Sequence, residues 1–415
     1  MPKSKQNLYR GRVLIIVENS WVPMDRRVWY EATTLRDAGW HVSIICPAAK
    51  GAHAGSESIE KLVVWEAENL EGINVFRFPL VFAEQGVLNY FREYFYAFFS
   101  ILYLTFKIWR REGFDILHIS NPPDIFFPIA LFYRLFGVAI IFDHHDLFTE
   151  MIAHRYHGLL GQIFYMLARF CEYLTYKVSN FVIVTNNSYQ NIAQDRGGLP
   201  INHIIVVRNG PKLEDFKPVK PDMSLKHNHK NMVCFVGIMG EEDGVLELVE
   251  VIDHVVNKFE RKDILFTMIG DGSARDPAME KLSSLGLSEH VNAPGMIRDD
   301  LVLRKYMSAA DIFVSPEPDS PLNSKSTFVK IGEYMSMGKA IVAFDLPETR
   351  FTASDSAVYV PNGDVVGFAK AIIKLLDEPH LSQKMGQRGR QRVIEKIAWK
   401  HQAHNLTCLY ERFFS

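Results

Sequence analysis

The chain has 415 residues, and two domains are expected because a single hydrophobic core stops growing at roughly 250–300 residues. Hydrophobic residues make up 48% of the sequence and charged residues 23%, which is ordinary for a globular protein in water. The formal net charge of -2 gives no basic field for a nucleic-acid partner. The 4 cysteines form no Cys-x-x-Cys pair, which argues against a zinc site or a disulfide framework and fits a reducing cytosol.

Short β-branched runs alternate with helical patterns through the first half of the chain. The apolar run 13–17 is too short for a signal peptide and is expected to be the first strand. A helix should follow it, with Asp25 as its N-cap and Gly39 as its stop. Further buried strands are expected at 42–46, 116–119, 139–142, 181–184 and 204–207. This alternation predicts an α/β fold with a doubly wound parallel sheet.

The most apolar region, residues 94–106, leaves two interpretations open. It carries no charge but is shorter than the roughly 20 residues that a membrane-spanning helix needs. Basic residues flank it, among them Arg92, Lys107 and Arg110. It is either a buried helix of the first domain or a helix at a membrane interface. The second interpretation predicts peripheral membrane contact through 87–112, at the inner face of the membrane, for an otherwise cytoplasmic protein.

The alternating pattern stops at 213–231, where prolines, charges and the string KHNHKN predict a linker. A second series of strands is then expected at 232–236, 264–269, 312–314, 340–343 and 357–360. From 377 onward the chain is expected to be helical, with a break near Pro379. We therefore expect a first domain at 1–212, a second at 232–395 and a C-terminal helix at 396–415 that packs back toward the first domain. Two such sheets place ligands at the carboxyl ends of their strands, in a cleft between the domains.

The strongest site signal is the segment 324–344, SKSTFVKIGEYMSMGKAIVAF. Ser326 or Ser324 could cap a helix whose N-terminal N–H groups form an anion site. Lys330 and Glu333 are three positions apart and share one helix face, which suits a diphosphate near Lys330 and ribose hydroxyls at Glu333. An ordinary amphipathic helix with an ion pair would explain the same spacing.

This segment resembles the donor-binding segment of retaining glycosyltransferases of family 4, which reads approximately Glu-x7-Glu-Ala-Met-Ala-x-Gly-x-Pro-Val-Val. Glu333 takes the second acidic position, which in that family binds the ribose of the donor nucleotide. The resemblance extends over nearly the whole chain, through 25–47, 206–216, 235–244, 268–276 and 375–393. It implies a GT-B fold of two Rossmann-like domains. It also implies transfer of a sugar from a nucleotide-diphosphate donor to a hydroxyl acceptor, with retention and without a metal or other cofactor.

The sequence departs from the family pattern where cations are expected. The first glutamate of the paired motif would fall at Lys325. The family often has Gly-Arg and Lys-Gly after the first strand of the second domain, where this chain has 237–238 (Gly-Ile) and 243–244 (Asp-Gly). The leaving diphosphate must therefore be neutralised otherwise. The candidates are Lys330, Arg208, Lys325 and the helix terminus near Ser326.

A second site signal, 142–150 (FDHHDLFTE), follows a buried strand of the first sheet. Its histidines and aspartates suggest a metal cluster. However, neighbouring side chains on a strand point to opposite faces, so His144 and His145 cannot chelate one ion. The resemblance implies instead that His145 faces the sugar and the donor phosphate. His145 and Lys330 are thus the catalytic candidates, and Asp146 is expected either to set the tautomer of the histidine or to accept a hydrogen bond from a substrate.

Several other residues are expected to line the cleft. The residues expected to bind the donor, besides Lys330, are Gly237, Gly270, Glu317, Asn323, Ser326, Thr327, Glu333 and Arg208. Those expected to bind the acceptor are Asp25, Arg26, Arg27, Asn121 and Asp124. Simpler explanations exist for the second set: a helix cap, solvated arginines and a rigid turn at the neighbouring prolines.

Three functions compete. The resemblance favours a transferase, whose acceptor would be a polysaccharide or lipid-linked glycan precursor because of the apolar segment. A sugar-nucleotide epimerase has the same fold and needs no acceptor. The missing cations would also suit a non-catalytic subunit that binds sugar nucleotide. A Rossmann dehydrogenase is excluded because the loop after the first strand lacks Gly-x-Gly-x-x-Gly.

Overall fold

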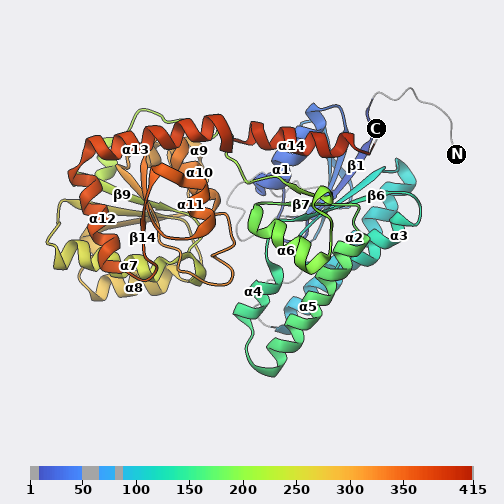
Figure 1. The fold of residues 1–415 in the computed structure, drawn as a ribbon, viewed down its shortest axis with the longest axis horizontal. Coiled ribbons are helices and arrows are strands. Elements are labelled where there is room, and N and C mark those ends of the chain that lie inside the picture. Colours follow the sequence, from blue (N-terminus) through green and yellow to red (C-terminus); the bar gives the residue numbers. More distant parts are fainter. Residues whose placement is uncertain (1–8, 49–64, 80–86, 414–415) are drawn as a thin grey trace. The chain divides into compact units, whose positions relative to one another are not determined.

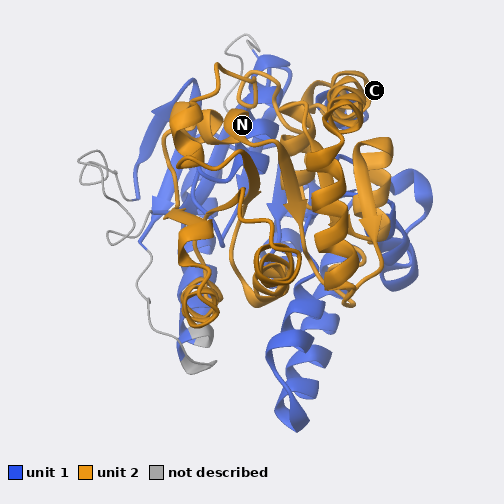
Figure 2. Cartoon of the chain, turned by 90° about the vertical axis from the view of Figure 1, so that its left-hand side faces the viewer, with its two compact units in different colours: residues 1–208, 403–415 blue, residues 209–402 orange. Residues whose placement is uncertain are grey.

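The computed structural model describes residues 9–48, 65–79 and 87–413. The chain divides into two units, each with a sheet of its own (Figure 2). Unit 1 comprises Met1–Arg208 and Ala403–Ser415, and unit 2 comprises Asn209–Gln402. Residues 213–231, expected as a linker, lie in unit 2, where Lys226 forms an ion pair with Asp311.

Unit 1 contains an 8-stranded sheet in the order β3-β4-β2-β1-β5-β6-β7-β8. Every pairing is parallel except that of β3 with β4, as the buried β-branched runs predict. The strands are β1 (Arg12–Ile16), β2 (His41–Pro47), β3 (Ala67–Leu70), β4 (Ile73–Phe78), β5 (Ile116–Ser120), β6 (Ala139–His144), β7 (Phe181–Val184) and β8 (Ile204–Val206). The hairpin of β3 and β4 is not predicted from the sequence.

Helices cover both faces of this sheet. On one face lies α1 (Arg26–Asp37), together with the C-terminal helix α14 (Trp399–Glu411), and on the other lie α2, α3 and α5 (Figure 1). The side chain of Asp25 accepts a hydrogen bond from the N–H of Val28, so the predicted N-cap of α1 is confirmed. The remaining helices of unit 1 are α2 (Val87–Arg111), α3 (Phe127–Arg134), α4 (Phe148–Arg155), α5 (Gly158–Val178) and α6 (Asn187–Gly197).

Unit 2 contains a 6-stranded parallel sheet in the order β11-β10-β9-β12-β13-β14. The strands are β9 (Asn231–Val236), β10 (Ile264–Ile269), β11 (Val291–Gly295), β12 (Ile312–Ser315), β13 (Ala340–Phe344) and β14 (Ala357–Val360). The helices are α7 (Val245–Asp253), α8 (Arg275–Ser284), α9 (Asp300–Ala309), α10 (Val329–Ser336), α11 (Pro347–Ala353), α12 (Val365–Asp377) and α13 (Pro379–Arg392). One hydrophobic core joins the sheet to α7, α8 and α12, and another joins it to α9 and α10. The predicted α/β fold of two doubly wound sheets is thus confirmed.

The C-terminal segment returns to unit 1. The break expected near Pro379 is confirmed, since α12 ends at Asp377 and Pro379 begins α13. A second break, at Ala398, precedes α14. Tyr410 of α14 packs edge-on against Trp40, and its hydroxyl lies 2.7 Å from Nδ1 of His118. The last helix therefore completes the core of unit 1, as expected.

Within the described residues, every helix is too short or too polar to cross a membrane.

Candidate functional site

The candidate site in unit 1 lies where β5 and β6 end. His145 directly follows β6, and its Nδ1 lies 3.0 Å from Oδ2 of Asp143. Burial lowers the pKa of His145, but the charge and the hydrogen bond of Asp143 raise it further, to about 9. His145 is therefore an imidazolium at neutral pH, with its Nδ1–H donated to Asp143. Its orienting partner is Asp143, although Asp146 was expected; the Nε2 atom of His145 lies 4.0 Å from Asp146.

Besides His145, Arg27 also binds the carboxylate of Asp143. Its guanidinium donates to both carboxylate oxygens of Asp143, at 2.6 and 2.8 Å, and to the carbonyl oxygen of Val207. The expectation of a solvated Arg27 is wrong, because the side chain is buried. Its donors are also used internally, which leaves the expected role at an acceptor phosphate to Arg26, an exposed residue of the same turn. Arg27 instead keeps Asp143 ionised beneath His145.

Asn121 fixes the turn that carries His145. Its Oδ1 accepts from the backbone N–H groups of His145 and Asp146, at 2.9 and 3.1 Å, and its Nδ2 donates to the carbonyl oxygen of Asp146 at 2.7 Å. The side chain is fully buried, so it positions the histidine and does not face a ligand as expected. Asp124 is also buried, and burial raises the pKa of its carboxyl well above the usual range.

Three buried side chains of unit 1 could geometrically hold a metal ion. Ligand atoms of Glu31, His118 and Asp143 all lie within 4.8 Å of one another. Arg27 already contacts two of them, with Nη2 3.2 Å from Glu31 and 2.6 Å from Asp143. A cation thus neutralises this group. Glu31 was not predicted from the sequence because a glutamate inside a helix is typical of an exposed surface residue. His118 was not predicted because it lies within the buried strand β5 and not in the loop after it.

His144 lies on the other side of the strand from its neighbour. Its Nδ1 is 2.7 Å from the hydroxyl of Tyr176, and the ring stacks on Phe142. Burial lowers the pKa of His144 to about 3, so it is a neutral core histidine. The opposite directions of His144 and His145 are those that the strand period predicts.

The candidate site in unit 2 is centred on Lys330, in the first turn of α10. Its Nζ lies 2.5 Å from Oε1 of Glu317 and 3.5 Å from Oδ1 of Asp243, over the ring of Phe235. Burial lowers the pKa of Lys330, but the two carboxylates outweigh burial and raise it above the ordinary value. The predicted residues Glu317 and Lys330 are thus brought together. The sequence did not predict that Asp243, at a position where the family often has lysine, would join them.

Glycines allow the loops around Lys330 to approach closely. A Cβ on Gly270, where φ is 143°, would lie 1.8 Å from the carbonyl oxygen of Gly237. A Cβ on Gly237 would lie 3.0 Å from Nζ of Lys330. Gly270 therefore needs to be glycine for the backbone contact between the loops after β9 and β10, whereas a side chain at Gly237 would crowd the side chain of Lys330.

The loop before α10 differs from the expectation at its hydroxyl residues. The helix begins at Val329, and its N-cap is Phe328, which makes no side-chain cap. Ser326 donates its hydroxyl to the carbonyl oxygen of Leu322, so the predicted serine cap is wrong. Asn323 donates to the carbonyl oxygens of Glu242 and Pro318 and ties this loop to the loop after β9.

The other predicted residues lie in the same elements or at the unit boundary. Thr327 lies in the loop before α10, and Glu333 is half-buried within that helix. Arg208 is the last residue of the first segment of unit 1, and its Nη2 lies 3.4 Å from Oδ1 of Asn187.

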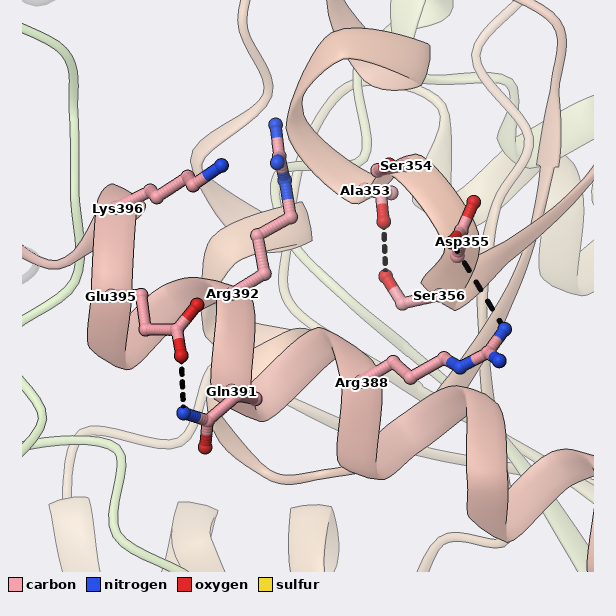
Figure 3. A pocket seen from close by; sticks show the side chains of 9 residues that line it. All are labelled: Ala353, Ser354, Asp355, Ser356, Arg388, Gln391, Arg392, Glu395 and Lys396. Carbon is pink, nitrogen blue, oxygen red and sulfur yellow. Dashed lines mark hydrogen bonds and ion pairs between the residues drawn. The ribbon is translucent and has the colours of Figure 1, made fainter.

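A separate pocket of about 360 Å³ lies in unit 2, between α13 and the turn after α11 (Figure 3). Arg388, Arg392 and Lys396 line one side of it and Asp355 the other. Arg392 donates to the carbonyl oxygens of Thr352 and Phe351. None of the residues predicted to bind the donor lines this pocket.

Comparison with known proteins agrees with this architecture. The family model described as Glycosyltransferase Family 4 matches residues 24–215, and the model described as Glycosyl transferases group 1 matches residues 230–378. Together the two models cover most of the chain. The chain belongs to glycosyltransferase family 4.

Relatives of this glycosyltransferase include the alpha-maltose-1-phosphate synthase of Mycobacterium tuberculosis, 26% identical over 271 residues, which are 60% of this chain and 67% of the relative. The sucrose-phosphate synthase of Thermosynechococcus elongatus has a similar structure, with a TM-score of 0.74, 19% identity and coverage of 98% and 99% of the two chains. The structure of HepE of Anabaena in complex with UDP-glucose is also similar, with a TM-score of 0.69 and 12% identity. The alignment covers 97% of this chain and 100% of HepE. These structures confirm the GT-B fold.

Proposed function

We propose that this family 4 glycosyltransferase moves a sugar from a nucleotide-diphosphate sugar to a hydroxyl group, with retention and without a metal ion. The acceptor is a polysaccharide or lipid-linked glycan precursor. The observation that carries the proposal is the buried Lys330, held by Glu317 and Asp243 at the carboxyl edge of the second sheet. This is the edge at which doubly wound sheets bind ligands.

The donor occupies the first turn of α10 and the glycine-lined loops beside it. Glu333 accepts the ribose hydroxyls, and Lys330 contacts the diphosphate. Glu317 and Asn323 lie toward the sugar, and Ser326 and Thr327 toward the phosphates. The UDP-glucose bound by HepE supports a donor of this class.

The positive charge of Lys330 is already paired with carboxylates in this structure. An incoming diphosphate must compete with a carboxylate 2.5 Å from Nζ. The chain also lacks the family's usual arginine and lysine after β9. The imidazolium of His145 supplies a further positive charge in the proposed reaction. It stabilises the diphosphate as the bond from the anomeric carbon to the phosphate oxygen breaks, while the acceptor oxygen bonds to that carbon and its proton passes to the departing phosphate oxygen.

Nucleotide release tests the proposal. The full chain is incubated with a panel of nucleotide sugars, with and without candidate lipid-linked or glycan acceptors, and the freed nucleoside diphosphate and the products are measured. Acceptor-dependent release is expected, and addition of a chelator should leave the rate unchanged. Conversion of the donor to its epimer without an acceptor would establish the epimerase instead, and binding without turnover would establish the non-catalytic subunit.

Glu333→Gln tests the ribose contact. Nucleotide affinity should fall by at least about tenfold, which corresponds to about 1.4 kcal/mol, because a charge-assisted hydrogen bond is lost. Glu247→Gln, on helix α7, which packs in the other core of unit 2, makes the same change of charge and serves as the control. An affinity for nucleotide that is unchanged in Glu333→Gln would refute the assignment.

A further inference from the structure

The helix α2 is apolar on two opposite faces. Ala97, Ile101, Leu104 and Ile108 are buried against the sheet of unit 1. The residues Phe95, Phe99, Tyr103 and Phe106 follow the same spacing of three or four but are exposed. Because a helix that is apolar all round is normally buried, the second face implies a partner. The interpretation as a buried helix is confirmed for the first face, and the interpretation as an interface helix stays a prediction for the second.

The neighbouring helices continue this exposed apolar face. Leu131, Phe132, Leu135 and Phe136 are exposed along α3 and just beyond its end, and Trp109 of α2 packs edge-on against Phe132. The exposed residues of α5 are Leu159, Leu160, Ile163, Met166, Leu167, Phe170 and Tyr173. Their spacing also places them on one stripe, opposite the buried Ala168, Glu172 and Tyr176.

The exposed apolar residues of the three helices face the same way. The helices α2, α3 and α5 cover the same face of the sheet, so the side of each helix that is not packed on the sheet points away from it (Figure 1). The hairpin of α4 and α5 projects beyond the rest of unit 1 in both views (Figures 1 and 2). Leu159 and Leu160 begin α5 at that hairpin and are 75% and 66% exposed. We call this surface the outer face.

The charges on these helices decide which partner suits the outer face. In the described parts of α2, α3, α4 and α5, the exposed charged residues are Arg92, Arg110, Arg111, Arg134, Arg155 and Lys177. All of them are basic, and the acidic residues of the same helices are buried or half-buried. A second copy of the chain would bring like charges together, whereas an anionic lipid surface attracts them.

We propose that the outer face of α2, α3 and α5 docks on the surface of an anionic membrane, with the α4–α5 hairpin inserted at the level of the headgroups. The aromatic and aliphatic side chains enter the interface, and the basic residues contact the lipid phosphates. This extends the membrane contact expected at 87–112 to two further helices. It does not depend on the reaction proposed above, because none of these residues belongs to the candidate sites.

Flotation of the full chain with vesicles tests this proposal. The protein should float with vesicles of phosphatidylcholine and phosphatidylglycerol, and binding should weaken with phosphatidylcholine alone or at high salt. The double variant Leu159→Ser, Leu160→Ser should bind at least about tenfold more weakly, because two exposed leucines of the hairpin no longer bury apolar surface in the interface. Arg110→Gln with Arg111→Gln should give a similar loss, on the anionic vesicles alone.

Leu301→Ser, at an exposed position of α9 in unit 2, is the matched control and should bind as the parent does. Thermal melting of every variant shows that each is folded. Failure of the parent chain to bind anionic vesicles would overturn the proposal, as would full binding by the Leu159 and Leu160 variant. A vesicle-free dimer that the same variant dissociates would assign the outer face to a second copy of the chain.

Discussion

The Nδ1 atom of His145 lies 3.0 Å from the carboxylate of Asp143, which lies two residues earlier, near the end of β6. His145 directly follows this strand and continues its alternation, so the two side chains point the same way. The pair places an imidazolium at the carboxyl edge of the first sheet; Asp143 balances its charge, and Arg27 in turn keeps Asp143 ionised.

The His145–Asp143 pair should make the stability of unit 1 depend on pH. The pKa of His145 is about 9 when folded and 6.5 without the fold, so its stabilisation is complete below pH 6.5 and is lost as pH rises through 9. The loss is at most about 3.5 kcal/mol, since one pKa unit corresponds to about 1.4 kcal/mol. Urea unfolding between pH 6 and 10 measures it. In His145→Gln this part of the pH dependence should vanish, and its persistence would show that other groups cause it.

Removal of the Asn121 side chain should make the position of His145 less well defined, although it leaves the histidine itself unchanged. Asn121→Ala leaves two N–H groups and one carbonyl of the turn without their partners, which should destabilise the protein by roughly 1–3 kcal/mol. The rate should fall at least about tenfold, because small displacements of a catalytic group are costly. Asn257→Ala, at an exposed site, should change stability by less than about 0.5 kcal/mol. A stable but fully active Asn121→Ala would contradict the positioning role.

Asp243 competes with the donor for Lys330, so removing its charge should tighten binding. Asp243→Asn should strengthen the affinity for a nucleoside diphosphate about tenfold, a change of about 1.4 kcal/mol. Titration calorimetry measures this, with Glu241→Gln, at an exposed position of the same loop, as a control of equal charge change. Weaker binding in Asp243→Asn would mean that this carboxyl contacts the donor itself.

Loss of Lys330 should act in the opposite direction. Lys330→Met removes the cation and leaves Glu317 buried without its ion pair, so both donor affinity and stability should fall, the latter by roughly 3–5 kcal/mol. The double variant with Glu317→Gln separates the two effects. It should recover stability, as followed by thermal melting, but not donor affinity. Recovery of both would place the diphosphate elsewhere.

Gly270 should tolerate no side chain. Gly270→Ala places a Cβ 1.8 Å from the carbonyl oxygen of Gly237, so the loop after β9 must shift, at a cost of more than about 2 kcal/mol. Gly363→Ala also has a positive φ, of 79°, but no atom within 4 Å, and it isolates the cost of the backbone conformation. Equal melting temperatures of the two variants would show that the contact with Gly237 is unimportant.

Periodicity predicts most of this fold but not its weakest strands. Buried parallel strands such as β10 are continuous apolar runs, which local sequence reveals. β11 reads Val-Asn-Ala-Pro-Gly, is only half-buried and pairs with a register shift, so its position depends on its neighbour β10. The hairpin of β3 and β4 likewise has polar residues such as Glu68 and Asn69.

The sequence indicated which residues lie in the candidate sites better than it indicated which residues they contact there. Lys330 was singled out from the helix start in a segment that resembles family 4, His145 from the same resemblance, and Glu317 from its place in the loop after a strand. The partners of these residues come from distant segments: Arg27 lies 116 positions from Asp143, and Lys330 lies 87 from Asp243. Such pairings require the strand order, which no local pattern contains. Asn121 was predicted as a ligand contact because the same signal, a polar residue at a strand end, also marks a residue that fixes a turn.

The return of α14 to unit 1 sets an order of events during synthesis. Tyr410 covers Trp40 and bonds to His118, both in the part of the chain made first. A ribosome must therefore translate all of unit 2 before the core of unit 1 can close. Until then α1 is the only described helix that covers this face of the sheet, and a fragment that stops before residue 403 never acquires the cover that α14 provides.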